Sequence, residues 1–225
     1  MMLEQNLQRV RKEIAAAARR SGRDPGDVRL VAVTKTVGVE SVRQAAALGL
    51  KDFGENRLQE AREKVAAFPE LCWHFIGRLQ SNKVKDVITH FTLIHSLDRF
   101  SLAEELQRCG DRLDLEFAAL VQVNVAGEDS KSGLDPSELP DFLDALRRMP
   151  RIKVEGLMTM APWADDPEEV RPVFRQLWEL RRKYRSPEMN LPHLSMGMTG
   201  DFAVAVEEGA TMVRIGSALF GVRRG

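Results

Sequence analysis

The stretch LVAVTK at residues 30–35 is an uninterrupted apolar run that ends on a lysine. Small and β-branched residues in such a run predict a strand buried on both faces, as in a parallel sheet. Because side chains alternate along a strand, Lys35 shares a face with Val31 and Val33. If that face looks into a barrel, desolvation disfavours the ammonium form and leaves a nucleophilic amine, of the kind that forms Schiff bases with carbonyl compounds. The alternative is a lysine that only ends a strand and reaches water.

Outward from this stretch, short apolar runs alternate with amphipathic segments. Continuous apolar runs predict buried strands, and apolar residues at three- and four-residue steps predict helices. The expected strands are 30–35, 52–56, 72–77, 91–96, 115–125, 152–160, 191–196 and 211–215. The expected helices are 39–48, 58–67, 81–88, 99–109, 136–149, 167–184, 201–208 and 217–221, with one more at 3–21 ahead of the first strand.

Strands that alternate strictly with helices through eight units predict an α/β fold, a closed (β/α)8 TIM barrel. We expect residues 1–225 to form one domain, with helix 3–21 as an extra element that lies as a lid over the bottom of the barrel. A doubly wound open sheet is the structural alternative. That fold would be expected to carry a glycine-rich fingerprint after its first strand, and the sequence TKTVG at 34–38 does not provide one.

Polar residues end several of the expected strands, among them Lys35, Asn56, Ser96 and Asn124. The chemistry of a barrel of this kind gathers at the C-terminal ends of its strands, which form its mouth. A single polar strand end is common in any globular protein. The position of all these polar residues on one predicted rim, however, indicates a functional site.

The last two strand ends indicate an anion site. SMGMTGD at 195–201 and RIGS at 214–217 each lead from a strand into the start of a helix, and these two loops are the usual phosphate site of such barrels. Glycines let the backbone come close to an anion, helix amides point at it, and Ser195, Thr199 and Ser217 could add hydroxyl donors. Two ordinary helix caps with glycine turns would give the same pattern.

Arg214 shares a strand face with Met212 and should reach the mouth close to Lys35, because the eighth strand closes beside the first. An arginine keeps its proton, so it can only donate hydrogen bonds. A salt bridge to an acid such as Glu55 across the barrel is the alternative role.

Charge and hydropathy exclude several classes of function. Lysine plus arginine and aspartate plus glutamate number 33 each, so no net field recruits nucleic acid or an anionic membrane. The basic clusters carry no interleaved aromatic residues, as a nucleic-acid platform would need. No apolar run approaches the roughly 20 residues of a membrane span.

The histidines and cysteines show no metal-ligand spacing. His74 lies within an expected strand. It is interpreted as a hydrogen-bonded core histidine, because a histidine at such a position is more often that than a catalytic base. His90 and His193 are expected at strand starts, on the bottom of the barrel, in structural roles. Cys72 and Cys109 are expected to be reduced thiols, which indicates a cytoplasmic protein.

Ordered blocks along nearly the whole chain resemble the pyridoxal phosphate (PLP) homeostasis protein family. They are VAVTKT at 31–36, FGENRLQEA at 53–61, WHFIGRLQSNK at 73–83, HSLDR at 95–99, SKSGL at 130–134, GLMTM at 156–160, LSMGMTGDF at 194–202 and VRIGSALFG at 213–221. The family is similar to the barrel domain of alanine racemase and binds PLP at the barrel mouth.

The resemblance implies that Lys35 carries PLP as an internal aldimine and that Arg214 lies at the pyridine nitrogen. It implies a further set of residues around the phosphate, Ser195, Thr199, Gly216 and Ser217, and two that line the cofactor, Asn56 and Met196.

Two positions depart from the family pattern. Thr199 stands where serine is more usual, and it keeps the hydroxyl. Arg57 stands where tyrosine often occurs, on the rim, where we expect it to affect access more than binding.

Two functions of different class remain. One is a binding protein that buffers PLP and hands it to apo PLP-dependent enzymes. The other is a PLP-dependent, racemase-like enzyme, which needs acid–base groups on both faces of the cofactor. Alanine racemases supply one of these as a tyrosine from a C-terminal β domain, contributed across a dimer. We expect that domain to be missing, since the chain stops at Gly225, and we expect Tyr184 to face away from the mouth.

We therefore expect a monomeric PLP homeostasis protein without strong catalytic activity. A class I aldolase that uses Lys35 would share the barrel, the amine and the phosphate site. The block-by-block likeness to the PLP homeostasis family argues against it.

Overall fold

The computed structural model of the chain describes residues 2–128 and 132–221. Residues 129–131 lie outside the described residues, so the SKSGL block is described only from Ser132 onward. No helix within the described ranges is long and apolar enough to cross a membrane.

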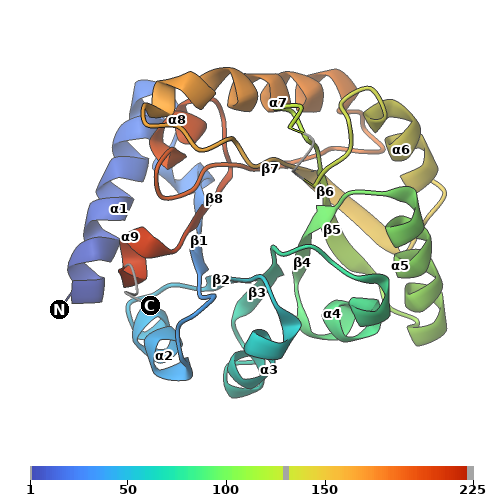
Figure 1. Cartoon of the computed structure of the whole chain (residues 1–225), viewed down its shortest axis with the longest axis horizontal. Helices are drawn as coiled ribbons and strands as arrows, with labels where there is room; N and C mark the ends of the chain where they lie inside the picture. The colour runs from blue at the N-terminus through green and yellow to red at the C-terminus, as the bar shows by residue number, and fades with distance from the viewer. Residues whose placement is uncertain (1, 129–131, 222–225) are drawn as a thin grey trace.

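Eight parallel strands close into a barrel in which each strand pairs with the next along the chain. β8 (Met212–Ile215) pairs with β1 (Arg29–Val33) and closes the ring. Figure 1 shows the helices arranged around the outside of the strands. The prediction of a (β/α)8 barrel is confirmed, and the closure between β1 and β8 excludes the open sheet.

The other strands are β2 (Asp52–Glu55), β3 (Cys72–Phe75), β4 (Leu93–Leu97), β5 (Phe117–Gln122), β6 (Ile152–Met158) and β7 (His193–Ser195). The helices are α1 (Met2–Arg20), α2 (Val39–Ala47), α3 (Leu58–Ala67), α4 (Val84–His90), α5 (Phe100–Leu113), α6 (Leu139–Leu146), α7 (Arg171–Tyr184), α8 (Phe202–Glu207) and α9 (Ser217–Phe220). Several strands end one or two residues earlier than the sequence predicted, so the polar rim residues lie mostly in the loops that follow them. His90 ends a helix and does not start a strand.

Alternation along the strands sorts the apolar side chains into two cores. The larger core fills the space between the strands and the surrounding helices and includes Ala32, Phe53 and Ile94. A second, smaller cluster lies in the barrel interior and consists of Val31, Leu93, Leu120, Met158 and Met212.

The N-terminal helix lies beside the barrel, which corrects the expectation of a lid over the bottom. Its apolar face, with Leu7, Val10 and Ile14, packs against α8 and α9, as Figure 1 shows. Asn6 Nδ2 also donates to the Leu219 carbonyl at 2.9 Å. α8 and α9 have only 6 and 4 residues, so they leave a stretch of barrel wall that α1 covers.

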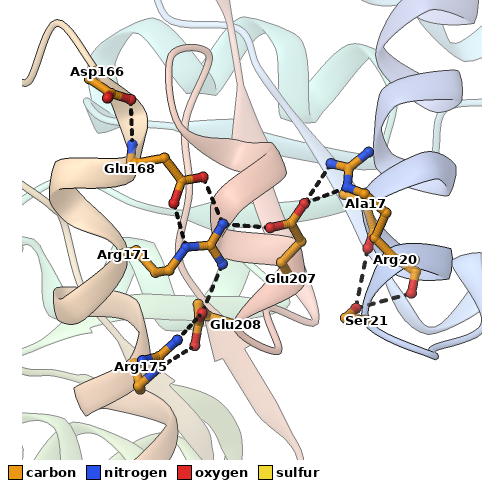
Figure 2. Close-up of polar contacts among 10 residues, drawn as sticks. Ala17, Arg20, Ser21, Asp166, Glu168, Arg171, Arg175, Glu207 and Glu208 are labelled. Atoms are coloured by element: carbon orange, nitrogen blue, oxygen red, sulfur yellow. Dashed lines mark hydrogen bonds and ion pairs between the residues drawn. The ribbon is translucent and has the colours of Figure 1, made fainter.

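An ion-pair cluster fastens α1 to its neighbours (Figure 2). Glu207 at the end of α8 pairs with Arg20 of α1 and with Arg171 of α7, both at 2.6 Å. Arg171 also pairs with Glu208 at 2.8 Å, and Glu208 pairs with Arg175 at 2.9 Å. Several charges in a network contribute more than isolated surface pairs do. The cluster therefore fastens α1 to the end of α8, and the end of α8 to α7.

Candidate functional site

Lys35 lies in a tight turn just beyond β1, and not within the strand as the sequence predicted. The strand ends at Val33, and the Val37 amide donates back to the Thr34 carbonyl at 3.1 Å. Thr36, the third residue of this turn, has a φ of +73°, which is a left-handed conformation that is costly for a β-branched residue. Strain of this kind is often stored at functional sites.

The Lys35 turn lies at the same end of the barrel as the Gly216 turn. A Cβ atom placed on Gly216 would lie 3.4 Å from the carbonyl oxygen of Val33, two residues ahead of Lys35. The Lys35 side chain is exposed, and it makes no hydrogen bond or ion pair with any residue in the described ranges. The side chain is therefore not desolvated against the barrel wall, as the sequence analysis considered, and its amine can take up a ligand without breaking an existing contact.

A buried ion pair holds the backbone just ahead of Lys35. Lys64 of α3 donates to Glu55 Oε1 and to the Thr34 carbonyl, both at 2.7 Å. The Thr34 hydroxyl donates to the same Glu55 oxygen at 2.5 Å. Lys64 is 5% exposed and Glu55 is 0% exposed. Sequence reasoning missed Lys64, although it falls on the apolar stripe of its helix, and a charged residue on such a stripe is a usable signal.

Lys64→Met is expected to destabilise the protein by about 3–5 kcal/mol, because it leaves the buried Glu55 carboxylate without its counter-charge. Adding Glu55→Gln should recover much of that loss, as a coupled pair requires. The measurement is the free energy of unfolding in denaturant. Lys85→Met, an exposed change on α4, is the control and should stay within about 0.5 kcal/mol. Equal costs for Lys64→Met and Lys85→Met would contradict this role of the ion pair.

Asn56 follows β2 on the same rim. A Cβ atom on Gly77 would lie only 2.0 Å from the Asn56 carbonyl oxygen, so glycine alone lets these two strand ends approach so closely. Gly77 therefore fixes the position of Asn56. Arg57 is the N-cap residue of α3, is exposed, and pairs with Glu60 at 3.3 Å.

Arg214 is a buried cation without an acidic partner in the described part of the chain. It is 5% exposed, and it donates from Nη1 to Ser195 Oγ at 2.5 Å and from Nη2 to the Thr159 carbonyl at 2.9 Å. The alternative of a salt bridge to Glu55 is wrong, because Glu55 is taken by the ion pair behind β1. Desolvation lowers the pKa of Arg214 to about 10, while Asp201 acts in the opposite direction.

The surroundings of Arg214 place its guanidinium at the mouth end of the barrel. Ser195 is the last residue of β7, and Thr159 follows the last residue of β6. Its remaining N–H groups have no acceptor among residues 2–128 and 132–221. A buried charge without a counter-ion is costly to the fold, and such a group marks a candidate ligand site.

The structure separates Ser195 and Met196 from the other expected cofactor residues. The Ser195 hydroxyl faces the barrel interior, between Arg214 and His95 Nδ1, which lies 2.9 Å away. The Ser195 hydroxyl therefore contacts the Arg214 guanidinium and does not point toward the loops in which the sequence analysis expected the phosphate. Met196 points to the opposite face and is fully buried in the core between strands and helices, so only its backbone can line a ligand.

Thr199 and Ser217 come together at the mouth from the two loops that the sequence singled out. Ser217 Oγ donates to Thr199 Oγ1 at 3.2 Å, and the Ala218 amide approaches the same oxygen at 3.4 Å. Beside them an open cavity of about 370 Å³ reaches α1, where Arg9 adds positive charge that the sequence analysis did not assign. The lining residues are Arg9, Val10, Glu13, Thr199, Phe202, Ser217 and Ala218.

Gly197→Ala is expected to destabilise the loop after β7 by about 3 kcal/mol, since it adds backbone strain and overpacking. Gly197 has a φ of +92°, and a Cβ atom there would lie 2.6 Å from Ala205 Cβ and 2.9 Å from Phe202 Cα. Gly200→Ala, in the same loop, meets nothing within 4 Å and is the matched control. Thermal unfolding of the two variants checks this, and similar midpoints would contradict it.

Larger depressions lie elsewhere on the molecule. One of about 680 Å³ lies between α3 and α4, and one of about 740 Å³ surrounds the start of β6. Neither is lined by a residue from the C-terminal ends of the strands. The buried cation, the free amine and the paired hydroxyls are at the mouth, so the chemistry locates the site there.

Comparison with known proteins agrees with this geometry. The sequence profile of the alanine racemase N-terminal domain matches residues 5–224. The pyridoxal phosphate homeostasis protein of Aquifex aeolicus is 47% identical over 223 residues, which cover 98% of both chains. This chain belongs to that family. The homologue of the same name in Escherichia coli is 40% identical and covers 97% of this chain and 95% of its own.

Solved structures of relatives share the barrel. PipY of Synechococcus elongatus with PLP bound is 37% identical, with a TM-score of 0.80, over 94% of this chain and all of its own, 100%. Alanine racemase from Corynebacterium glutamicum is 19% identical, with a TM-score of 0.72, over 96% of this chain and 62% of its own. The second likeness shows a common fold.

Proposed function

We propose that this protein binds PLP at the barrel mouth and serves PLP homeostasis, holding the cofactor and releasing it to other proteins. The observation that carries the proposal is Arg214, a buried guanidinium with unused N–H groups and no carboxylate partner in the described ranges. Support comes from the PLP-bound structure of PipY and from the names of the homologues.

The residues at the mouth fit the three functional groups of PLP. PLP supplies an aldehyde that condenses with a lysine amine, and the free amine of Lys35 fits this group. Arg214 can donate to the ring nitrogen, since it has no acceptor capacity of its own. Thr199 and Ser217 offer hydroxyls to the phosphate, next to the glycines of their loops. Asn56 lies on the same rim and can contact the ring edge.

The position of Tyr184 favours binding over racemisation. It is the only tyrosine of the sequence, and it ends α7 on the side where β7 begins, which is the end of the barrel opposite to the mouth. A tyrosine at this position cannot act as the acid–base group on the second face of a cofactor at the mouth.

A transfer experiment tests the homeostasis role. The PLP-loaded protein is mixed with a defined apo PLP-dependent enzyme, and the recovery of that enzyme's activity is followed over time. Delivery faster than the release of PLP into buffer supports direct hand-over to apo enzymes, and an equal rate reduces the protein to a reservoir. Rapid loss of chirality of L-alanine with the loaded protein would replace the proposal with the racemase alternative.

We further propose that the chain acts in the cytoplasm as one monomeric domain. Both cysteines, Cys72 and Cys109, are unpaired, which fits a reducing compartment. Light scattering of the loaded and unloaded protein tests the monomer, since a dimer would double the mass.

A further inference from the structure

A chain of polar side chains crosses the barrel interior beneath Arg214. Ser195 Oγ, which accepts from Arg214, lies 2.9 Å from His95 Nδ1. His95 Nε2 lies 2.9 Å from His74 Nδ1, and His74 Nε2 lies 3.0 Å from Asp52 Oδ1. The contacts are continuous from the guanidinium to the carboxylate.

This chain connects the two ends of the barrel. Ser195 is on β7 and His95 on β4, which are not neighbours in the closed sheet, so their contact spans the lumen. Arg214 lies near the C-terminal end of β8, whereas Asp52 is the first residue of β2, at the bottom. The Asp52 side chain is 21% exposed and reaches solvent there.

Burial fixes the charge of the central member. His95 is 0% exposed, and desolvation, followed by the electrostatic influence of His74, Arg214 and His193, lowers the pKa of His95 well below its usual range. It is therefore neutral, with one N–H group and one bare nitrogen. The position of that single proton sets the direction of the chain.

Counting donors and acceptors selects one direction. Arg214 only donates, so the Ser195 hydroxyl gives its proton to His95 Nδ1, and neutral His95 carries its own proton on Nε2. His95 Nε2–H then donates to His74 Nδ1, and His74 Nε2–H donates to the Asp52 carboxylate, which only accepts. Ser195 Oγ keeps a lone pair for Arg214. In the reverse arrangement the Ser195 proton would have no acceptor in the described part of the chain. A buried donor left unsatisfied in this way carries a free-energy penalty.

We propose that Asp52, His74, His95 and Ser195 form a one-directional hydrogen-bond relay that positions Arg214 for the ring nitrogen of the bound cofactor. The ligand in this inference rests on the proposed function, but the proton arrangement does not. Asp52 sets the direction from the bottom, and Ser195 presents a fixed acceptor to Nη1. The four are positioning residues, because they act on the cofactor only through the guanidinium.

Histidine 15N NMR of the protein without cofactor tests the proton arrangement directly. The four histidines of the sequence give four signal sets, and His74 and His95 are both expected as Nε2–H tautomers at neutral pH. Asp52→Leu removes the terminal acceptor and should mix the tautomers of His95, which Asp52 does not touch. Asp52→Asn keeps an acceptor oxygen and should restore the pattern, and Asp27→Asn, an exposed change, is the control. A His95 tautomer that is indifferent to Asp52→Leu overturns the relay.

The absorption spectrum of bound PLP tests the link to Arg214. His95→Gln and Ser195→Ala should both shift the cofactor band and weaken binding on the order of tenfold, as loss of a buried hydrogen bond to a charged group predicts. Ser195→Thr should restore both, and His90→Gln, an exposed change, should alter neither. Unchanged spectra and affinities in the first two variants overturn the positioning role. Expected tautomers in a wild-type protein that takes up no PLP would support the relay and refute the proposed function.

Discussion

Lys35→Ala is expected to remain colourless with PLP, while the wild-type protein turns yellow and is fixed to the cofactor by borohydride. The reason is that the Lys35 amine is exposed and has no partner in the described ranges, whereas Lys64, the buried lysine behind the same turn, is held by Glu55. Loss of the covalent bond should weaken PLP binding by at least about tenfold, or ~1.4 kcal/mol. Absorption spectroscopy and mass spectrometry after reduction measure both effects.

Two controls make the Lys35 experiment specific. Lys51→Ala removes an exposed lysine at the other end of the barrel, just before β2, and should leave the colour unchanged. The unfolding midpoint of Lys35→Ala should stay close to wild type, because exposed side chains contribute within about 0.5 kcal/mol. Borohydride fixation at another lysine in Lys35→Ala, with unchanged affinity, would refute the assignment.

Arg214→Met is expected to weaken PLP binding while the cofactor-free protein keeps or gains stability. Desolvation lowers the pKa of Arg214 from its usual value to about 10. A base whose folded pKa is lowered costs stability at every pH below that value, and the cost fades only as the pH rises above about 10 towards the higher pKa of the unfolded chain. At neutral pH the cost is on the order of 3 kcal/mol. Methionine removes this desolvation cost. The opposing penalty is about 1–3 kcal/mol, because the Thr159 carbonyl loses its hydrogen-bond donor.

Denaturant unfolding of the cofactor-free variant and PLP titration of the same preparation measure the two halves of this prediction. Arg214→Lys keeps the charge but loses the planar fork of donors, so it should retain the stability cost without restoring the wild-type spectrum. A large loss of stability in Arg214→Met together with normal PLP binding would show that the guanidinium serves the fold and not a ligand.

The barrel and its rim could be predicted from the sequence because both depend on local patterns. Apolar runs such as LVAV at 30–33 and the amphipathic segments between them define eight βα units, and parallel strands bring Lys35, Asn56 and Arg214 to one end. The pairing of Thr199 with Ser217 also follows, because β7 and β8 are neighbours.

The sequence does not contain, in any local pattern, the contacts that cross the barrel. The bond between His95 and Ser195 joins residues 100 positions apart, so no local pattern reveals it. The loop position and the family likeness both point Ser195 to the phosphate instead. The burial of Lys64 depends on Glu55, at the end of the strand that precedes its helix, and on the Thr34 carbonyl, one strand further away. The turn that follows the early end of β1 includes Thr36 in a left-handed conformation, which runs against the preference of threonine. The sequence does not place the helix at 3–21 correctly. Its apolar stripe indicates that the helix packs against another element, but not that this element is α8 and α9.

The packing of α1 against α8 and α9 has a consequence for synthesis of the chain. The helix leaves the ribosome before every strand of the barrel, yet α8 and α9, the segments that shield Leu7, Val10 and Ile14, are translated only after β7 and β8 respectively. Until then an unshielded amphipathic helix is exposed to chaperones and to other nascent chains, and contacts so distant in sequence form slowly. The fold is therefore completed late, when α1 packs against α8 and α9.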